Sequence, residues 1–137
     1  MDFNWWAIIV AVFVMNIVGM VWYGNTLLGK EWRRLVGISD ADMEAAQKTG
    51  GPWKAMGIGM IASLVMVYVL AHIVYTYQAT DALSGIMGGF WVWLGFFATT
   101  MLNSVLYERR PLRLYAINVG YYLVTLLAAG AILAVWR

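Results

Sequence analysis

Four long apolar stretches, separated by three short polar segments, fill almost the whole of this chain. A helix needs about 20 predominantly apolar residues to cross the hydrocarbon core of a bilayer. Water is absent there, so a crossing segment has to satisfy its own backbone polar groups, as a helix does. The pattern therefore predicts an all-α fold, an integral membrane bundle of four transmembrane helices. The expected spans are residues 5–28, 53–77, 83–107 and 111–136.

The composition agrees with this architecture. Of the 137 residues, 63% are hydrophobic and only 12% are charged, whereas soluble domains average about 25% charged residues. The spans and their loops account for the full length, so we expect a single four-helix transmembrane domain over residues 1–137. The first span lacks the basic leader and short apolar core of a cleaved signal peptide, so we expect it to be retained.

The first loop, residues 29–51, is the longest polar segment. Trp32, Leu35 and Val36 fall on one helical face, which predicts a short helix in the membrane interface that Gly37 ends. Ser39 precedes Asp42 by three residues, the spacing of a capping box, and this predicts a second short helix over residues 41–48.

Basic residues gather at one end of the predicted bundle. Cytoplasmic loops of membrane proteins carry an excess of lysine and arginine, and here only Arg137 lies on the opposite side. We therefore expect a multi-pass protein of the cell membrane, a bacterial inner membrane, with both termini outside the cytoplasm. Its net charge of +2 fits contact with membrane lipids rather than nucleic acid. The eight residues on the cytoplasmic side are Lys30, Arg33, Arg34, Lys48, Lys54, Arg109, Arg110 and Arg113.

Polar residues recur at one depth in the third and fourth spans. At 1.5 Å per residue, Asn103 and Asn118 lie roughly 8–14 Å from the third loop, with Thr99 and Tyr121 in or near the same layer. This layer either bonds the helices to one another or lines a cytoplasmic cavity that binds a small polar ligand. Asn16 stands alone at mid-depth, where it either joins two helices or belongs to a permeation path.

Ionisable residues near the membrane supply further candidates. His72 lies about 9 Å below the outer end of the second span. It is a candidate for a gate, a proton relay or a cofactor ligand shared between subunits, and the alternative is a neutral histidine held by a hydrogen bond. Glu108, with Arg109 and Arg110, lies at the membrane boundary. We expect Glu108 to form an ion pair with Arg33, Arg34 or Arg113, or this group to gate the mouth of the cavity.

Several kinds of chemistry are excluded by what the chain lacks. It has no cysteine and one histidine, so we expect no metal site, and no cofactor can be named. No span holds two carboxylates, and no glycine-rich loop is present to hold phosphate, which disfavours a hydrolase or a phosphoryl-transfer enzyme.

Small residues four positions apart recur in three of the spans. Such faces let helix backbones approach closely. These faces pack helices together either within one chain or between chains, and packing between chains would give a homo-oligomer or a complex with a partner membrane subunit. The pairs are Gly59 and Ser63, Gly85 and Gly89, Ala116 and Gly120, and Gly130 and Ala134.

Several short strings, taken in order, resemble a family of small bacterial four-span membrane proteins catalogued as domain of unknown function 1761. The resemblance covers nearly the whole chain and implies the same four-span topology, without a reaction or a ligand. It draws attention to His72, Asn103, Glu108, Arg110, Pro111, Asn118 and Tyr121. The strings are Trp22-Tyr23, Gly29-Lys30-Glu31-Trp32, residues 68–72, Trp93-Leu94-Gly95-Phe96, residues 107–111 and residues 117–121.

Three functional hypotheses follow. The first is a transporter-like or channel-like protein that binds a small polar ligand in the layer of Asn103, Asn118, Tyr121 and Thr99. The second is an accessory subunit without chemistry of its own, packed against a larger membrane complex. The third is a cofactor-binding membrane protein that uses His72 across a subunit interface.

Overall fold

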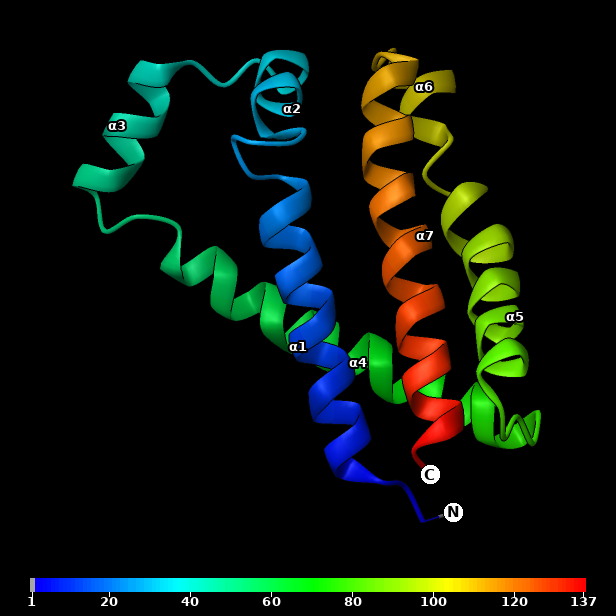
Figure 1. The fold of residues 1–137 in the computed structure, drawn as a ribbon. Helices are drawn as coiled ribbons and strands as arrows, with labels where there is room; N and C mark the ends of the chain where they lie inside the picture. Colours follow the sequence, from blue (N-terminus) through cyan, green and yellow to red (C-terminus); the bar gives the residue numbers. More distant parts are fainter. Residues whose placement is uncertain (1) are drawn as a thin grey trace.

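The computed structural model describes residues 2–137, and all regular secondary structure in that range is helical (Figure 1). Four of its helical segments are long and apolar enough to cross a membrane, as predicted: α1 (Trp5–Trp22), α4 (Trp53–Thr76), the segment Ala82–Leu106 and α7 (Leu112–Val135). The first span ends at Trp22 and not at residue 28 as expected, because residues 23–28 form turns and a bend. Both termini lie at one end of the molecule, called the terminal end here. The first and third connecting segments lie at the other, the loop end.

Two short helices occupy the first connecting segment, as expected. They are α2 (Gly29–Val36) and α3 (Asp40–Lys48). Gly37 ends α2 with a φ of 89°, a left-handed conformation that glycine adopts without steric cost. Both hydrogen bonds of the predicted capping box between Ser39 and Asp42 are present at the start of α3.

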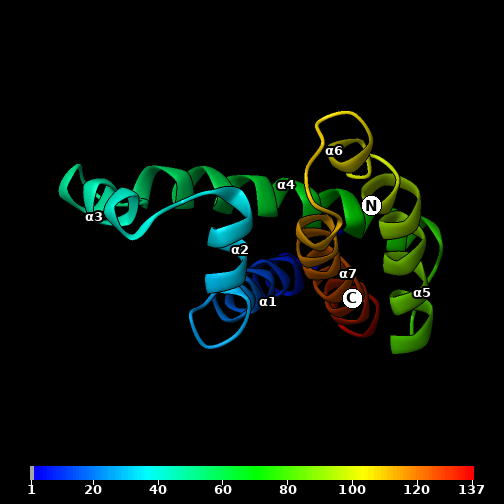
Figure 2. The same cartoon turned by 90° about the horizontal axis from the view of Figure 1, so that it is seen from above.

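The helix α4 crosses the other spans obliquely instead of running alongside them (Figure 2). Its first half extends away from the bundle, and Trp53 there is 72% exposed. Only its second half enters the core. The buried residues of α4 are Val67, Leu70, Ala71, Val74 and Tyr75. Hydropathy identifies a span but not its crossing angle, so the sequence did not predict this arrangement.

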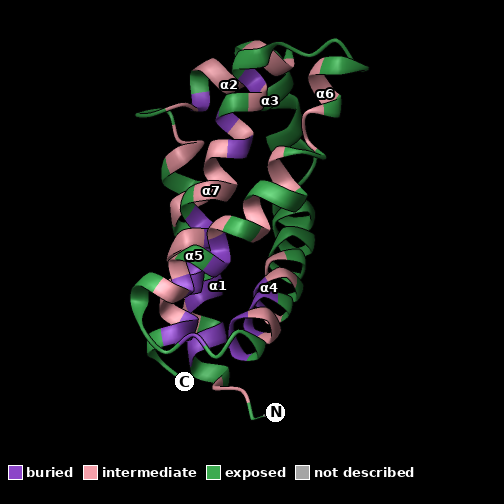
Figure 3. Ribbon diagram, turned by 90° about the vertical axis from the view of Figure 1, so that its right-hand side faces the viewer, coloured by how far each residue is buried: buried purple, intermediate pink, exposed green. Residues whose placement is uncertain are grey.

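The packed core consequently lies in the terminal half of the molecule (Figure 3). Ile8 and Met15 of α1 pack there with Leu126 and Leu133 of α7. At this end, the side-chain amide of Asn4 donates to the Trp136 carbonyl at 3.2 Å and connects the start of α1 to the end of α7. The loop half has fewer buried residues, and two of the largest cavities reach into it.

Close backbone contact joins α5 (Ala82–Val92) to α7. A Cβ atom added to Gly85 would lie 2.2 Å from the Gly130 carbonyl oxygen, and one added to Gly89 would lie 2.3 Å from that of Leu126. Two of the predicted small-residue pairs therefore meet within one chain. By contrast, a Cβ atom at Gly59 would meet nothing within 4 Å.

The third span departs from the single α-helix that we expected over residues 83–107. After α5, residues Trp93–Ala98 form a wider π-helical segment, η1, and a turn then leads into the short helix α6 (Asn103–Leu106). The hydroxyls of Thr99 and Thr100 donate to the carbonyls of Gly95 and Phe96 and so compete with regular helical bonding. Segments of this kind are frequent at functional sites.

The start of α5 gives a pH-dependent prediction. Asp81 accepts a hydrogen bond from the Ser84 N–H at 2.8 Å, and this bond holds the pKa of the carboxyl below its usual range. A lowered pKa in the folded state contributes stability above the unfolded pKa of about 3.9, and that contribution is lost as the pH falls through the folded value. Asparagine caps a helix without titrating. We therefore expect the wild type to lose stability relative to Asp81→Asn below about pH 4.

Thermal unfolding of both proteins in detergent, from about pH 6 to about pH 3, measures this difference. The many other carboxyls are shared by the two proteins and cancel in the comparison. A difference in melting temperature that stays constant over the whole range would contradict the prediction.

Candidate functional site

A polar cavity of about 360 Å³ lies at the loop end, between α6 and the first turns of α7. It combines one acidic, one basic and several neutral polar side chains that come from two spans and the turn between them. Its lining residues are Thr100, Met101, Asn103, Ser104, Glu108, Arg110, Leu114, Tyr115 and Asn118.

Local backbone structure brings these side chains together. The hydroxyl of Tyr115 donates to the Ala98 carbonyl at 2.6 Å, which ties α7 to the end of η1. The backbone N–H of Arg110 donates to the Ser104 carbonyl at 2.8 Å, closing the turn after α6. Arg109 has a φ of 57°, in the left-handed region, and lies between the two charged residues of the cavity. This turn carries both into one cavity.

The two charged side chains of the cavity have no ionic partner within residues 2–137. The ion pairs in that part of the chain both use Glu31 of α2, with Arg34 at 2.5 Å and Arg113 at 3.1 Å. The hydrogen bond from Arg34 and the charge of Arg113 lower the pKa of the Glu31 carboxyl. Arg34 and Arg113 therefore pair with Glu31 and not with Glu108. Glu108 and Arg110 therefore line the cavity without an ion pair to any of the described residues.

A second, larger cavity of about 760 Å³ opens between α1, the first half of α4 and α7. We call it the methionine cleft, because five flexible methionines line it. Polar groups in its wall include Asn16, Ser63 and Tyr121. Its methionines are Met15, Met20, Met56, Met60 and Met66. The oblique course of α4 leaves this space open, since its first half stands away from the other spans.

A single hydrogen bond lies at the boundary of the two cavities. The hydroxyl of Tyr23, which lines the methionine cleft, donates to Oδ1 of Asn118, which lines the polar cavity, at 2.8 Å. Nearby, the indole N–H of Trp22 donates to the Ile117 carbonyl at 2.9 Å and fixes the end of α1 against α7. The bond between Tyr23 and Asn118 therefore joins a residue of the methionine cleft to a residue of the polar cavity.

The family model described as protein of unknown function (DUF1761) matches residues 6–134, which include the four spans almost in full and the polar cavity. The chain belongs to this family. No curated protein and no solved structure matches it. Family membership and the four apolar helices together support a multi-pass membrane protein in contact with lipid, while neither assigns a reaction.

In this DUF1761 protein, the polar cavity collects four of the candidate residues, Asn103, Asn118, Glu108 and Arg110. Tyr115 also lines the cavity and was not among the predicted site residues, although it lies three residues before Asn118 and therefore on the same face of α7.

The other five candidates, among them Arg109, lie outside the polar cavity. Tyr121 lines the methionine cleft, and its hydroxyl donates to the Met15 carbonyl at 3.1 Å. Asn16 lines the same cleft and donates to the Val12 carbonyl at 2.8 Å. Thr99 donates to its own helix and is exposed. The expected single layer is thus divided: Asn103 and Asn118 line the polar cavity, Tyr121 lines the methionine cleft, and Thr99 lines neither.

His72 lies far along α4 from the polar cavity, within an aromatic cluster. The centroid of its ring lies 4.5 Å from the ring centroid of Phe3 and 4.7 Å from that of Tyr68. Its Nδ1 atom lies 3.2 Å from the Tyr68 carbonyl oxygen. This contact corresponds to the hydrogen-bonded alternative for His72. Among residues 2–137, no group of three or more His, Asp or Glu side chains is placed to hold a metal ion.

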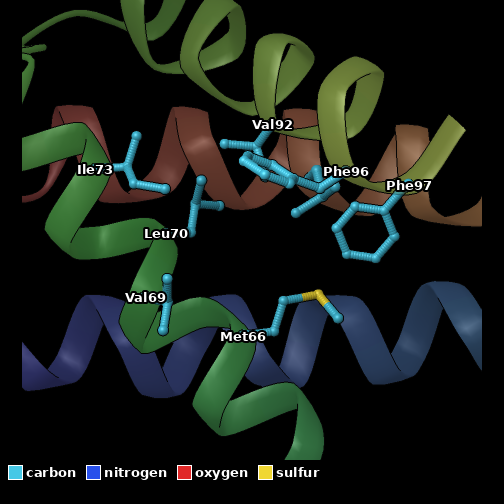
Figure 4. Close-up of a pocket in the computed structure, with 8 residues that line it drawn as sticks. Met66, Val69, Leu70, Ile73, Val92, Phe96 and Phe97 are labelled. Atoms are coloured by element: carbon cyan, nitrogen blue, oxygen red, sulfur yellow. The ribbon is translucent and has the colours of Figure 1, made fainter. Parts of the chain in front are cut away.

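A third cavity of about 410 Å³ lies between α4 and the third span (Figure 4). Its lining is entirely apolar, so it suits hydrocarbon and not a polar solute. The lining residues are Met66, Val69, Leu70, Ile73, Val92, Phe96, Phe97 and Leu126.

Proposed function

We propose that this DUF1761 protein is transporter-like and binds a small polar solute in the polar cavity. One observation carries the proposal: Asn103 and Asn118, from different spans, line one cavity together with Glu108 and Arg110. A concave site with a few convergent polar groups is typical of small-molecule binding. Each amide offers both donors and an acceptor, so the two asparagines suit a ligand rich in hydrogen-bonding groups.

The methionine cleft supports movement of the solute beyond this first site. It extends from Trp32, in the first connecting segment, to Asn16 in the middle of α1. The bond between Tyr23 and Asn118 joins a residue of the cleft to a residue of the polar cavity. In the proposed mechanism, a solute first binds the side-chain N–H groups of Asn118. Its binding then turns this amide away from Tyr23, and loss of the bond opens the cavity toward the cleft. The excess of basic residues in the first and third loops supports a cytoplasmic position for the polar cavity.

Substitution of the asparagines tests the proposal. Asn103 is the cleaner probe, since its side chain makes no hydrogen bond within residues 2–137 and its loss should leave the fold intact. A panel of sugars, amides, amino acids and organic acids is screened by thermal unfolding of the detergent-solubilised chain. We expect at least one solute to stabilise the wild type, and Asn103→Ala or Asn118→Ala to weaken its binding about tenfold.

Asn25→Ala is the matched control. Asn25 accepts a hydrogen bond from Arg33 in the first connecting segment and lines neither cavity. Its substitution should leave solute binding unchanged. The proposal fails if no solute in the panel stabilises the wild type, or if both cavity variants respond like Asn25→Ala.

An accessory subunit is the second candidate, and the exposed first half of α4 favours it. Ile58 and Ile61 are more than half exposed there, and Gly59 has open space beside it. A second copy of the chain or a different membrane subunit would cover this face. Native mass spectrometry of protein released gently from its own membranes distinguishes a second copy of the chain from a different subunit, since a homo-oligomer and a complex with another protein differ in mass.

A further inference from the structure

We infer that the polar cavity selects a small zwitterion that carries a primary ammonium group and an oxyanion, either carboxylate or phosphate. The inference rests on the proposed function and names its ligand class. A free amino acid and an ethanolamine phosphate headgroup share this chemistry.

The first argument is the charge of the cavity. Glu108 and Arg110 line it together, and neither forms an ion pair within residues 2–137. A ligand of one sign would neutralise one of these side chains and be repelled by the other. A ligand with both charges satisfies both side chains and leaves the site neutral. Near the membrane the effective dielectric constant is lower than in water, so this balance discriminates more strongly there.

The second argument concerns the anionic half of the ligand. The planar guanidinium of Arg110 offers paired donors that match carboxylate or phosphate oxygens. The first turn of α7 borders the cavity through Leu114, and the amino end of this long helix favours negative charge. Asn118 adds a donor. Its Oδ1 accepts from Tyr23, which leaves its side-chain N–H groups directed to other partners.

The third argument concerns the cationic half. A primary ammonium has three donors, and the cavity offers acceptors in the Glu108 carboxylate and the Asn103 amide oxygen. The Asn103 side chain makes no hydrogen bond to any residue from 2 to 137, so its oxygen is available. A quaternary ammonium has no donor and would leave both acceptors unsatisfied. The cavity should therefore distinguish ethanolamine from choline compounds.

The test uses the full chain in detergent, free of ethanolamine lipids. L-alanine and glycerophosphoethanolamine are the zwitterionic probes, and dissociation constants come from the shift of the unfolding midpoint with concentration. Propylamine, propionate and glycerophosphocholine are the comparison compounds. We expect one zwitterionic probe to bind at least tenfold more tightly than all three. Binding of alanine indicates a free solute, and binding of glycerophosphoethanolamine alone indicates a lipid headgroup.

Charge-neutralising variants complete the test. Glu108→Gln and Arg110→Gln should each weaken binding of the zwitterion about tenfold to one-hundredfold, the effect of losing a charged hydrogen-bond partner. Arg109→Gln is the matched control, because Arg109 lies in the same turn and does not line the cavity. The unfolding midpoint without ligand shows whether each variant is folded.

The possible outcomes separate the inference from the proposed function. Equal binding of singly charged compounds, or equal losses in Arg109→Gln and Arg110→Gln, would overturn the zwitterion inference. Binding of a neutral sugar or amide, with no response to either zwitterion, would overturn it while the proposed function stands. If no polar probe binds, both the zwitterion inference and the proposed function are wrong.

Discussion

Replacing Gly85 by alanine is expected to destabilise the protein by about 3 kcal/mol, the upper range for forcing extra atoms into a packed interior. The added Cβ atom would lie 2.2 Å from the Gly130 carbonyl oxygen, which is backbone and cannot move aside as a side chain can. Gly130→Ala should cost a similar amount, because its Cβ atom would meet the Gly85 carbonyl oxygen at the same distance. Unfolding by sodium dodecyl sulfate in mixed micelles, followed by circular dichroism, measures the change.

Gly59→Ala is the control for this experiment. It also replaces a glycine within a span by alanine, but its new Cβ atom meets nothing within 4 Å. Alanine in a helix is favoured over glycine by about 0.5–1 kcal/mol, so this variant should be as stable as the wild type or slightly more so. A Gly85→Ala variant as stable as Gly59→Ala would contradict the assignment of the close contact to α5 and α7. Destabilisation by Gly59→Ala would indicate that a second chain approaches α4.

Single cysteines at the two ends of the molecule are expected to be labelled from opposite sides of the membrane. The chain has no cysteine, so each introduced thiol is unique. Glu44 is exposed in α3 at the loop end, and Thr80 is exposed in the second connecting segment at the terminal end. From the excess of basic residues in the first and third loops, we expect the loop end to face the cytoplasm.

A membrane-impermeant maleimide should therefore label Thr80→Cys in right-side-out vesicles and Glu44→Cys only in inverted vesicles. Detergent-permeabilised vesicles, in which both thiols should react, control for burial of either thiol. The reverse pattern would contradict the expected cytoplasmic orientation of the loop end and would show that the polar cavity faces the outer side. Labelling of both thiols in one intact preparation would indicate that the chain inserts in two orientations.

Much of the candidate site was predictable as a set of depths but not as a set of contacts. The rise of a helix per residue placed Asn103 and Asn118 at one level, and the structure brings both to one cavity. Tyr121, only three residues from Asn118, lines the methionine cleft instead. Depth follows from counting residues, whereas the direction in which a side chain points depends on what its helix packs against.

The sequence alone determined the four spans, the two short helices with their Gly37 end and their Ser39–Asp42 cap, and the family. These depend on local properties: the cost of placing backbone polar groups in hydrocarbon, and hydrogen bonds between residues a few positions apart. For the third span, the sequence predicted the length but not the π-helical segment η1. That segment is associated with the Thr99 hydroxyl, which bonds to its own helix, and with a hydrogen bond from Trp93 to α7.

Only the tertiary structure decided which residues meet. It turned α4 away from the other spans and opened the methionine cleft. It also brought Gly85 to Gly130, while it left Gly59 beside open space. Lastly, it paired Arg113 with Glu31 and so left Glu108 without an ionic partner in the described chain, residues 2–137. Crossing angles and partners result from the fit of whole helix surfaces, and that fit involves residues far apart in the sequence.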